Sequence, residues 1–253
     1  MKYTSLIIIL FFTITTNAQK KKEIIANNGF HIALTAQYYN KLQLHNTGAD
    51  LLQSRHTLSG EFTVSYHKEL VNNYGINIGA GLGLAPFNQN YHFKIPTNSI
   101  FYTGNYEQGG DYFDLIDYSY ANFIWVFPIS IDKSFILKKK QFNITLGGKL
   151  NLINAYPGII SLESSSIIDT NNLDVTLYKS NLFTTTKHNT LFTYFFKIGY
   201  LHKMKKRNLG INLIYNYSKQ NIMEGTYHFY NLPYESYGTI ENNINYIGIE
   251  FKL

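Results

Sequence analysis

Hydrophobic and polar residues alternate with a period of two in eight separate segments of the chain. These segments are residues 30–39, 58–67, 76–84, 122–131, 142–152, 192–201, 209–218 and 246–253. Successive side chains of a β-strand point to opposite faces, so each segment predicts a strand with one apolar and one more polar face. Alternation alone does not show which face meets water, because a strand of a soluble sandwich has the same period.

The lengths of the strands and of their connections favour a membrane protein. Most of the apolar rows reach the roughly 9–11 residues that cross a bilayer at a tilt, whereas soluble strands usually have about 5–6 residues. Short connections at 67–73, 132–140 and 202–208 alternate with long ones at 40–54, 86–117, 154–189 and 221–239. Short turns on one side and long external loops on the other predict an all-β fold, an eight-stranded antiparallel up-and-down transmembrane β-barrel.

Charge follows the same division between short and long connections. Basic residues gather on the short side, at Lys20, Lys21, Lys22, Lys68, Lys133, Lys138, Lys139, Lys140, Lys203, Lys205, Lys206 and Arg207. Acidic residues gather in the long connections, at Asp50, Glu107, Asp111, Asp114, Asp117, Glu163, Asp169, Asp174, Glu224 and Glu235. A soluble protein has no reason to sort charge by connection length, so the sorting supports the membrane interpretation.

Composition agrees with this picture. Only 15% of the residues are charged, while 45% are hydrophobic and 16% are aromatic. The net charge of +6 would by itself suit nucleic acid, but the start of the chain carries an export signal. Lys2 precedes the apolar run Leu6–Ile14, and Thr16-Asn17-Ala18 has the small residues of a cleavage site. We therefore expect a signal peptide at 1–18, cleaved after Ala18, a barrel domain at 19–253, and no nucleic-acid partner.

The architecture resembles the small outer-membrane β-barrels of Gram-negative bacteria, the group that contains the OmpA barrel, OmpX and OmpW. The resemblance covers nearly the whole mature chain, and its one local match is the C-terminal segment 246–253. There Tyr246, Gly248, Phe251 and Leu253 resemble the terminal signal that the barrel-assembly machinery reads, although such signals often end in an aromatic residue. The resemblance implies an outer-membrane location, and contacts with outer-membrane lipid, lipopolysaccharide and the assembly machinery.

Ionisable residues at inward positions are the main candidate site. An eight-stranded barrel is narrow enough for side chains to fill it, and a charge confined there is costly unless it is paired. The candidate group consists of Glu61, Lys149, Lys197 and Glu250. We expect Lys149 and Lys197, on neighbouring strands, to form a cluster with Glu61 in which they share its carboxylate or water. The cluster would serve as a structural plug or, less ordinarily, as an ion gate.

Several functions stay open at this point. The first is a non-enzymatic, monomeric anchor that presents surface loops to an external protein or glycan or supports the envelope. The alternatives are an OmpW-like transporter of small apolar molecules, a secreted lipocalin-like binder, and a lipid A-modifying enzyme. For an enzyme, His188 and His228 with Ser164, Ser165, Ser166, Ser180 and Glu224 are placed only by location, in no known motif. We expect no catalytic residue, no cofactor and no metal site, although acidic residues at 107–117 leave cation binding open.

Overall fold

The structure is a computed structural model of the chain. It describes residues 28–85, 91–96, 112–117, 122–137, 140–153, 160–168, 174–184, 190–203, 208–230 and 235–253. The expected signal peptide and its cleavage site lie outside these residues. In the described part of the chain, no helix is long and apolar enough to cross a membrane.

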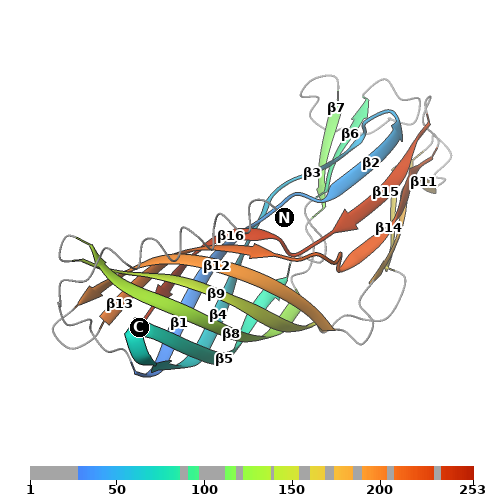
Figure 1. Cartoon of the computed structure of the whole chain (residues 1–253). Helices are drawn as coiled ribbons and strands as arrows, with labels where there is room; N and C mark the ends of the chain where they lie inside the picture. Colours follow the sequence, from blue (N-terminus) through green and yellow to red (C-terminus); the bar gives the residue numbers. More distant parts are fainter. Residues whose placement is uncertain are drawn as a thin grey trace, which may run out of the picture.

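Eight antiparallel strands close into a barrel in the order β1-β16-β13-β12-β9-β8-β5-β4, which confirms the predicted fold (Figure 1). The strands are β1 (Gly29–Tyr39), β4 (Thr57–Glu69), β5 (Tyr74–Ala85), β8 (Asn122–Leu137), β9 (Lys140–Ile153), β12 (Thr190–Lys203), β13 (Asn208–Tyr217) and β16 (Tyr246–Lys252). They correspond to the eight alternating segments of the sequence. The barrel closes because β1 pairs with β4 on one side and with the last strand, β16, on the other.

The apolar rows face outward, as predicted. Phe62, Leu146 and Ile249 are 43%, 46% and 47% exposed, although they are large hydrophobic residues in the middle of strands. Their polar neighbours in sequence, such as Glu61 and Glu250, are buried inside the barrel. A soluble barrel would have these faces reversed, so the orientation of the side chains excludes the lipocalin-like alternative.

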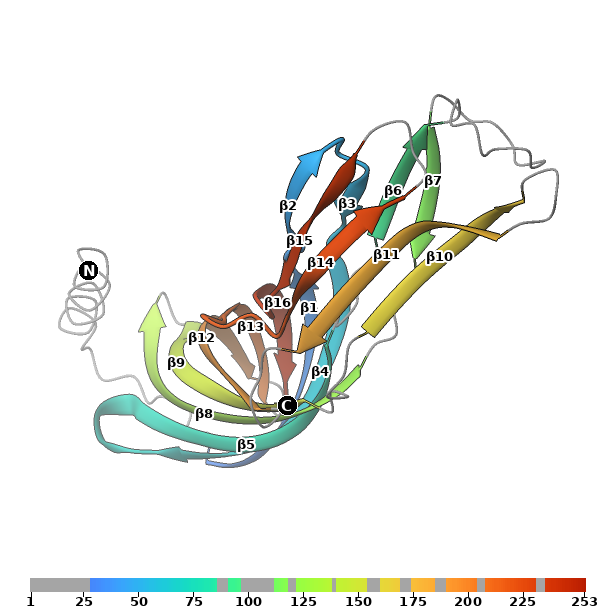
Figure 2. The same ribbon diagram turned by 90° about the vertical axis from the view of Figure 1, so that its right-hand side faces the viewer.

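The long connections, which we expected to be external loops, contain strands. Each contains a pair of strands, and these strands form two further sheets beyond one end of the barrel (Figures 1 and 2). The first sheet has the order β10-β11-β14-β15-β2, with β2 (Gln43–Gly48), β10 (Ile160–Ile168), β11 (Asp174–Thr184), β14 (Met223–Phe229) and β15 (Ser236–Asn242). The second has the order β3-β6-β7, with β3 (Leu52–Ser54), β6 (Tyr91–Pro96) and β7 (Tyr112–Asp117). We call these two sheets together the extension.

A continuous apolar core joins the extension to the barrel. Inward positions at the long-connection end of the barrel strands hold Ile124, Leu191 and Ile214, which are almost completely buried. They belong to the same hydrophobic cluster as Leu52 and Ile240 of the extension. The mouth of the barrel is therefore filled by apolar side chains, and the extension packs on this filling.

The turns at the other end are short. The 3-10 turn Val71–Asn73 joins β4 to β5, and Asn72 and Asn73 adopt positive φ angles of 60° and 63° there. Asparagine tolerates this left-handed conformation better than most residues, which suits the turn. Only residues 138 and 139 separate β8 from β9, whose ends pair with each other.

Candidate functional site in the barrel interior

A buried ion pair spans the lumen in the half of the barrel next to the extension. Glu61 comes from β4 and Lys149 from β9, which are three strands apart around the barrel. The Lys149 Nζ atom lies 2.7 Å and 2.8 Å from the two carboxylate oxygens of Glu61. It also donates a hydrogen bond of 2.7 Å to the hydroxyl of Tyr246. Hydrogen bonds thus join the Lys149 ammonium group to the Glu61 carboxylate and the Tyr246 hydroxyl across the lumen.

A second layer of contacts completes this group. Gln37 Nε2 donates to Glu61 Oε2 at 2.9 Å, and the Tyr39 hydroxyl donates to Gln37 Oε1 at 3.0 Å. The rings of Tyr39 and Tyr246 lie 5.1 Å apart. Burying a charge is costly unless it is paired and hydrogen-bonded, and here both charged groups meet that condition. We call Gln37, Tyr39, Glu61, Lys149 and Tyr246 the upper cluster.

Lys197 does not share the carboxylate of Glu61, so this part of the prediction is wrong. Its Nζ atom instead lies 2.5 Å from Glu250 Oε2, and Asn212 Nδ2 donates to Glu250 Oε1 at 2.7 Å. The reason is geometric, because β12 and β16 are separated only by β13, which carries Asn212. The four predicted residues therefore form two ion pairs rather than one cluster. The ring of Phe195 lies between the two lysines, 5.6 Å from Lys149 Nζ and 5.0 Å from Lys197 Nζ.

A third polar group lies nearer the short turns. His67 Nε2 is 3.2 Å from Asp132 Oδ1, which also accepts a hydrogen bond of 2.6 Å from Asn77. Lys252 Nζ donates to Asn77 Oδ1 at 3.3 Å from the opposite wall. We had placed Asp132 in a short turn, but β8 continues to Leu137. Continued alternation after Ser130 was the available signal that Asp132 points inward.

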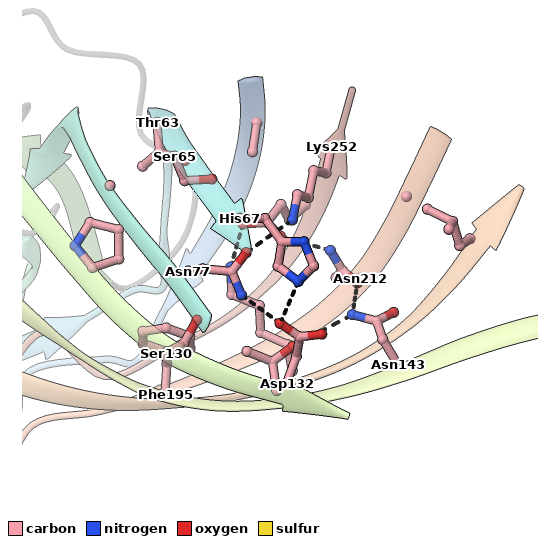
Figure 3. A pocket seen from close by; sticks show the side chains of 18 of the residues that line it. Thr63, Ser65, His67, Asn77, Ser130, Asp132, Asn143, Phe195, Asn212 and Lys252 are labelled. Carbon is pink, nitrogen blue, oxygen red and sulfur yellow. Dashed lines mark hydrogen bonds and ion pairs between the residues drawn. The ribbon is translucent and has the colours of Figure 1, made fainter. Parts of the chain in front are cut away.

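These residues line a cavity of about 80 Å³ in the half of the barrel next to the short turns. Figure 3 shows His67, Asn77, Asp132, Asn212 and Lys252 among the side chains that line it. A cavity of this size with such a lining has room for a few water molecules. The half of the lumen next to the short turns is therefore polar and wettable. The half next to the extension is closed by the upper cluster and by the apolar core.

The five-stranded sheet of the extension carries aromatic rings on its exposed face. His228 stacks on Tyr230, with ring centroids 4.3 Å apart, and on Tyr237, with centroids 5.8 Å apart. The next row across the strands carries Thr226 and Thr239 at exposed positions. The opposite face of the same strands is buried. The sequence did not predict this surface, because residues 221–239 were expected to form a loop.

The residues considered for chemistry are not brought together in the described part of the chain. His188 lies outside the described residues, and so do Glu107 and Asp111 of the acidic stretch. His228 is stacked between tyrosines, and Ser180 is buried on the other face of the sheet. Within the described ranges, no group of three or more His, Asp or Glu residues could hold a metal ion.

Of the C-terminal residues that resemble an assembly signal, Tyr246, Gly248 and Phe251 lie in β16, and Leu253 directly follows this strand. Tyr246 points into the lumen and Phe251 points outward. A Cβ at Gly248 would lie 2.7 Å from the backbone oxygen of Ala36, so a glycine is required by the close pairing with β1. The fold thus gives Tyr246 and Gly248 a structural role. Recognition of the segment by the assembly machinery stays a prediction.

Fold and interior together define a class of protein. A closed barrel satisfies its backbone hydrogen bonds internally, and this one turns apolar side chains outward and paired charges inward. That is the arrangement of a transmembrane β-barrel with a filled lumen.

The sequence matches no protein-family model and no curated protein sequence. Among solved structures, it is similar to the outer membrane protein OprG from Pseudomonas aeruginosa, at 8% identity and a TM-score of 0.38, over 91% of this chain and 99% of that one. It is also similar to Ail, the attachment invasion locus protein of Yersinia pestis, in complex with the heparin analogue sucrose octasulfate, at 11% identity and a TM-score of 0.30, over 90% and 100%. The beta domain of the Bordetella autotransporter BrkA follows at 11% identity and 0.27, over 89% and 98%. Identities and TM-scores are low, so no function is carried over from these proteins.

Proposed function

We propose that this protein is a non-enzymatic outer-membrane barrel that holds the extension on the cell surface as a platform for interaction. The observation that carries the proposal is the apolar core shared by the barrel mouth and the extension. A barrel filled in this way does not offer an open path for solutes. The same filling fixes the two sheets to a membrane-embedded base, because core side chains such as Leu191 and Ile240 pack as one unit.

The outer face of the five-stranded sheet supports the platform role. Tyr230 and Tyr237 are 39% and 40% exposed, and they flank His228 on a face that also carries Thr226, Thr239 and Lys179. Rigid rings combined with hydroxyl and amide groups suit contacts with a protein or a glycan. The partner would meet this face from outside the cell, since the long connections lie on the side away from both chain ends of the barrel.

Single cysteines test the orientation, because the native chain has none. We would label Thr226→Cys on the platform and Lys140→Cys at the short turns with a membrane-impermeant maleimide. On intact cells, the proposal expects labelling at position 226 only, and labelling at both positions after the outer membrane is permeabilised. Labelling at position 140 on intact cells, or release of the protein into buffer without detergent, would contradict the proposal.

A second candidate is passage of small apolar molecules sideways through the wall. The ladder between β5 and β8 is interrupted where Gly79 and Ala80 face Pro128 and Phe127, and the register does not change across the gap. Pro128 has no backbone N–H to donate, which accounts for the interruption. The cavity behind this gap is lined by His67, Asp132 and other polar groups, so its chemistry does not suit an apolar cargo. The platform role is therefore the better supported of the two.

A further inference from the structure

The outward rows of three barrel strands carry a lysine near the short-turn end. On β4, Lys68 follows Tyr66 in the outward row. On β8, Lys133 follows Ile131, and Phe135 and Leu137 continue the row beyond it. On β9, Lys140 precedes Phe142 in the same way. Side chains of one row share one face of the sheet, so each lysine directly continues a row of residues that face lipid. We call Lys68, Lys133 and Lys140 the basic rim.

Aromatic rings lie beside two lysines of the basic rim. The ammonium group of Lys133 lies 3.8 Å from the centroid of the Tyr74 ring and donates a hydrogen bond of 2.8 Å to the backbone oxygen of Asn72. The ammonium group of Lys140 lies 5.7 Å from the centroid of the Tyr200 ring. Phe142 packs beside Tyr200, with ring centroids 5.5 Å apart. Long basic side chains place their apolar stems on such surfaces and extend the charged group toward a polar boundary. The rim thus has the chemistry of an interface between lipid tails and charged head groups.

We call the outward apolar rows of the barrel together the apolar band. At its other end, next to the extension, no lysine continues an outward row in the described strands. There the described residues next to the apolar rows include His56, which stacks on Tyr38 at 4.6 Å, and Thr190 before Phe192. Lys41, Arg55 and Lys219 are exposed on that side, but they lie in segments between strands and do not continue an apolar row within a strand. Within the described strands, a lysine therefore continues an outward apolar row only toward the short turns.

We infer that the basic rim binds the phosphate groups of anionic phospholipids in the leaflet that surrounds the short turns. This inference rests on the proposed function, because it requires the barrel to lie in a membrane. An anionic phospholipid places its tails on the apolar band and its phosphate within reach of the lysines. A zwitterionic phospholipid carries its own ammonium group and gains less from the same contact, so the rim favours lipids with net negative charge.

The lipid preference is measurable with spin-labelled lipids. The full mature chain would be refolded into phosphatidylcholine vesicles that contain a trace of spin-labelled phosphatidylglycerol or phosphatidylcholine. We expect phosphatidylglycerol to be enriched at the protein surface at least about two-fold at low salt, in line with the attraction of lysines near an anionic surface. Salt at about 1 M should remove most of this enrichment, because it shortens the Debye length to about 3 Å.

Matched variants identify the groups responsible. Lys68→Gln, Lys133→Gln and Lys140→Gln together should bring the enrichment close to one, whereas Lys41→Gln with Lys219→Gln should leave it unchanged. An inserted native barrel without enrichment, or an equal loss in the control variant, would overturn the inference and leave the proposed function standing. If the native chain did not insert into vesicles at all, the proposed function would fall as well. Should the rim variant not fold, enrichment in the native protein that persists at high salt would overturn the inference.

Discussion

Neutralising Glu61 should destabilise the barrel strongly. In Glu61→Gln the side chain keeps its size and one acceptor, while Lys149, which is only 2% exposed, loses its counter-ion. Two of the three short contacts of the ammonium group are to Glu61, and only the Tyr246 hydroxyl remains as a full partner. Breaking a buried ion pair on one side costs about 3–5 kcal/mol. We expect a loss of about 3 kcal/mol or more in the free energy of unfolding.

The assay uses the single tryptophan of the chain. Trp125 lies on the outer face of β8 and is 53% exposed, so its fluorescence reports transfer of the wall from lipid to water. Urea unfolding in vesicles would be followed for the native protein, Glu61→Gln, Lys149→Met and the double variant. The double variant should recover much of the lost stability, because it leaves no unpaired charge in the upper cluster.

Two results would refute this reasoning. A loss below about 1 kcal/mol in Glu61→Gln would show that water or another group solvates Lys149, as it does for exposed pairs. A double variant no more stable than the single one would show that charge is not the cause. Conductance across a planar bilayer should stay at the native level in Glu61→Gln, because the apolar core still fills the mouth. An increase in conductance would show that the Glu61–Lys149 pair acts as a gate.

Three further changes test other parts of the structure. Glu250→Gln should cost less than Glu61→Gln in the same unfolding assay, because Glu250 lies beside the wettable cavity; an equal or larger loss would contradict that difference. Gly81→Ala should cost about 1–3 kcal/mol because its Cβ would overlap the backbone oxygen of Phe62, whereas Gly83→Ala, with its nearest atoms at 3.7 Å, should be neutral. Burial raises the pKa of Tyr227 to about 12, so the neutral phenol stabilises the extension below pH 10 and this contribution is lost as pH rises toward 12. The ultraviolet difference spectrum between native protein and Tyr227→Phe should therefore show tyrosinate only near pH 12, and a transition near pH 10 would contradict the burial.

The sequence by itself determined the barrel. Period-two alternation fixes the faces of a strand, and the alternation of short and long connections fixes an up-and-down order of eight strands. It also determined that Glu61, Lys149, Lys197 and Glu250 point inward, since all four occupy polar positions of their rows, although it did not find the inward Asp132. These features are local, so each can be read from a stretch of a few residues.

Only the tertiary structure decided which charges pair. The partner of Lys149 lies three strands away across the lumen, and that of Lys197 lies two strands away along the wall. Such distances depend on the closure and stagger of the whole barrel, which no single segment encodes. The same holds for the extension, where β11 pairs with β14 and β15 with β2. Those strands come from different connections, so their pairing and the apolar core beneath them exist only once the barrel has brought its long connections to one end.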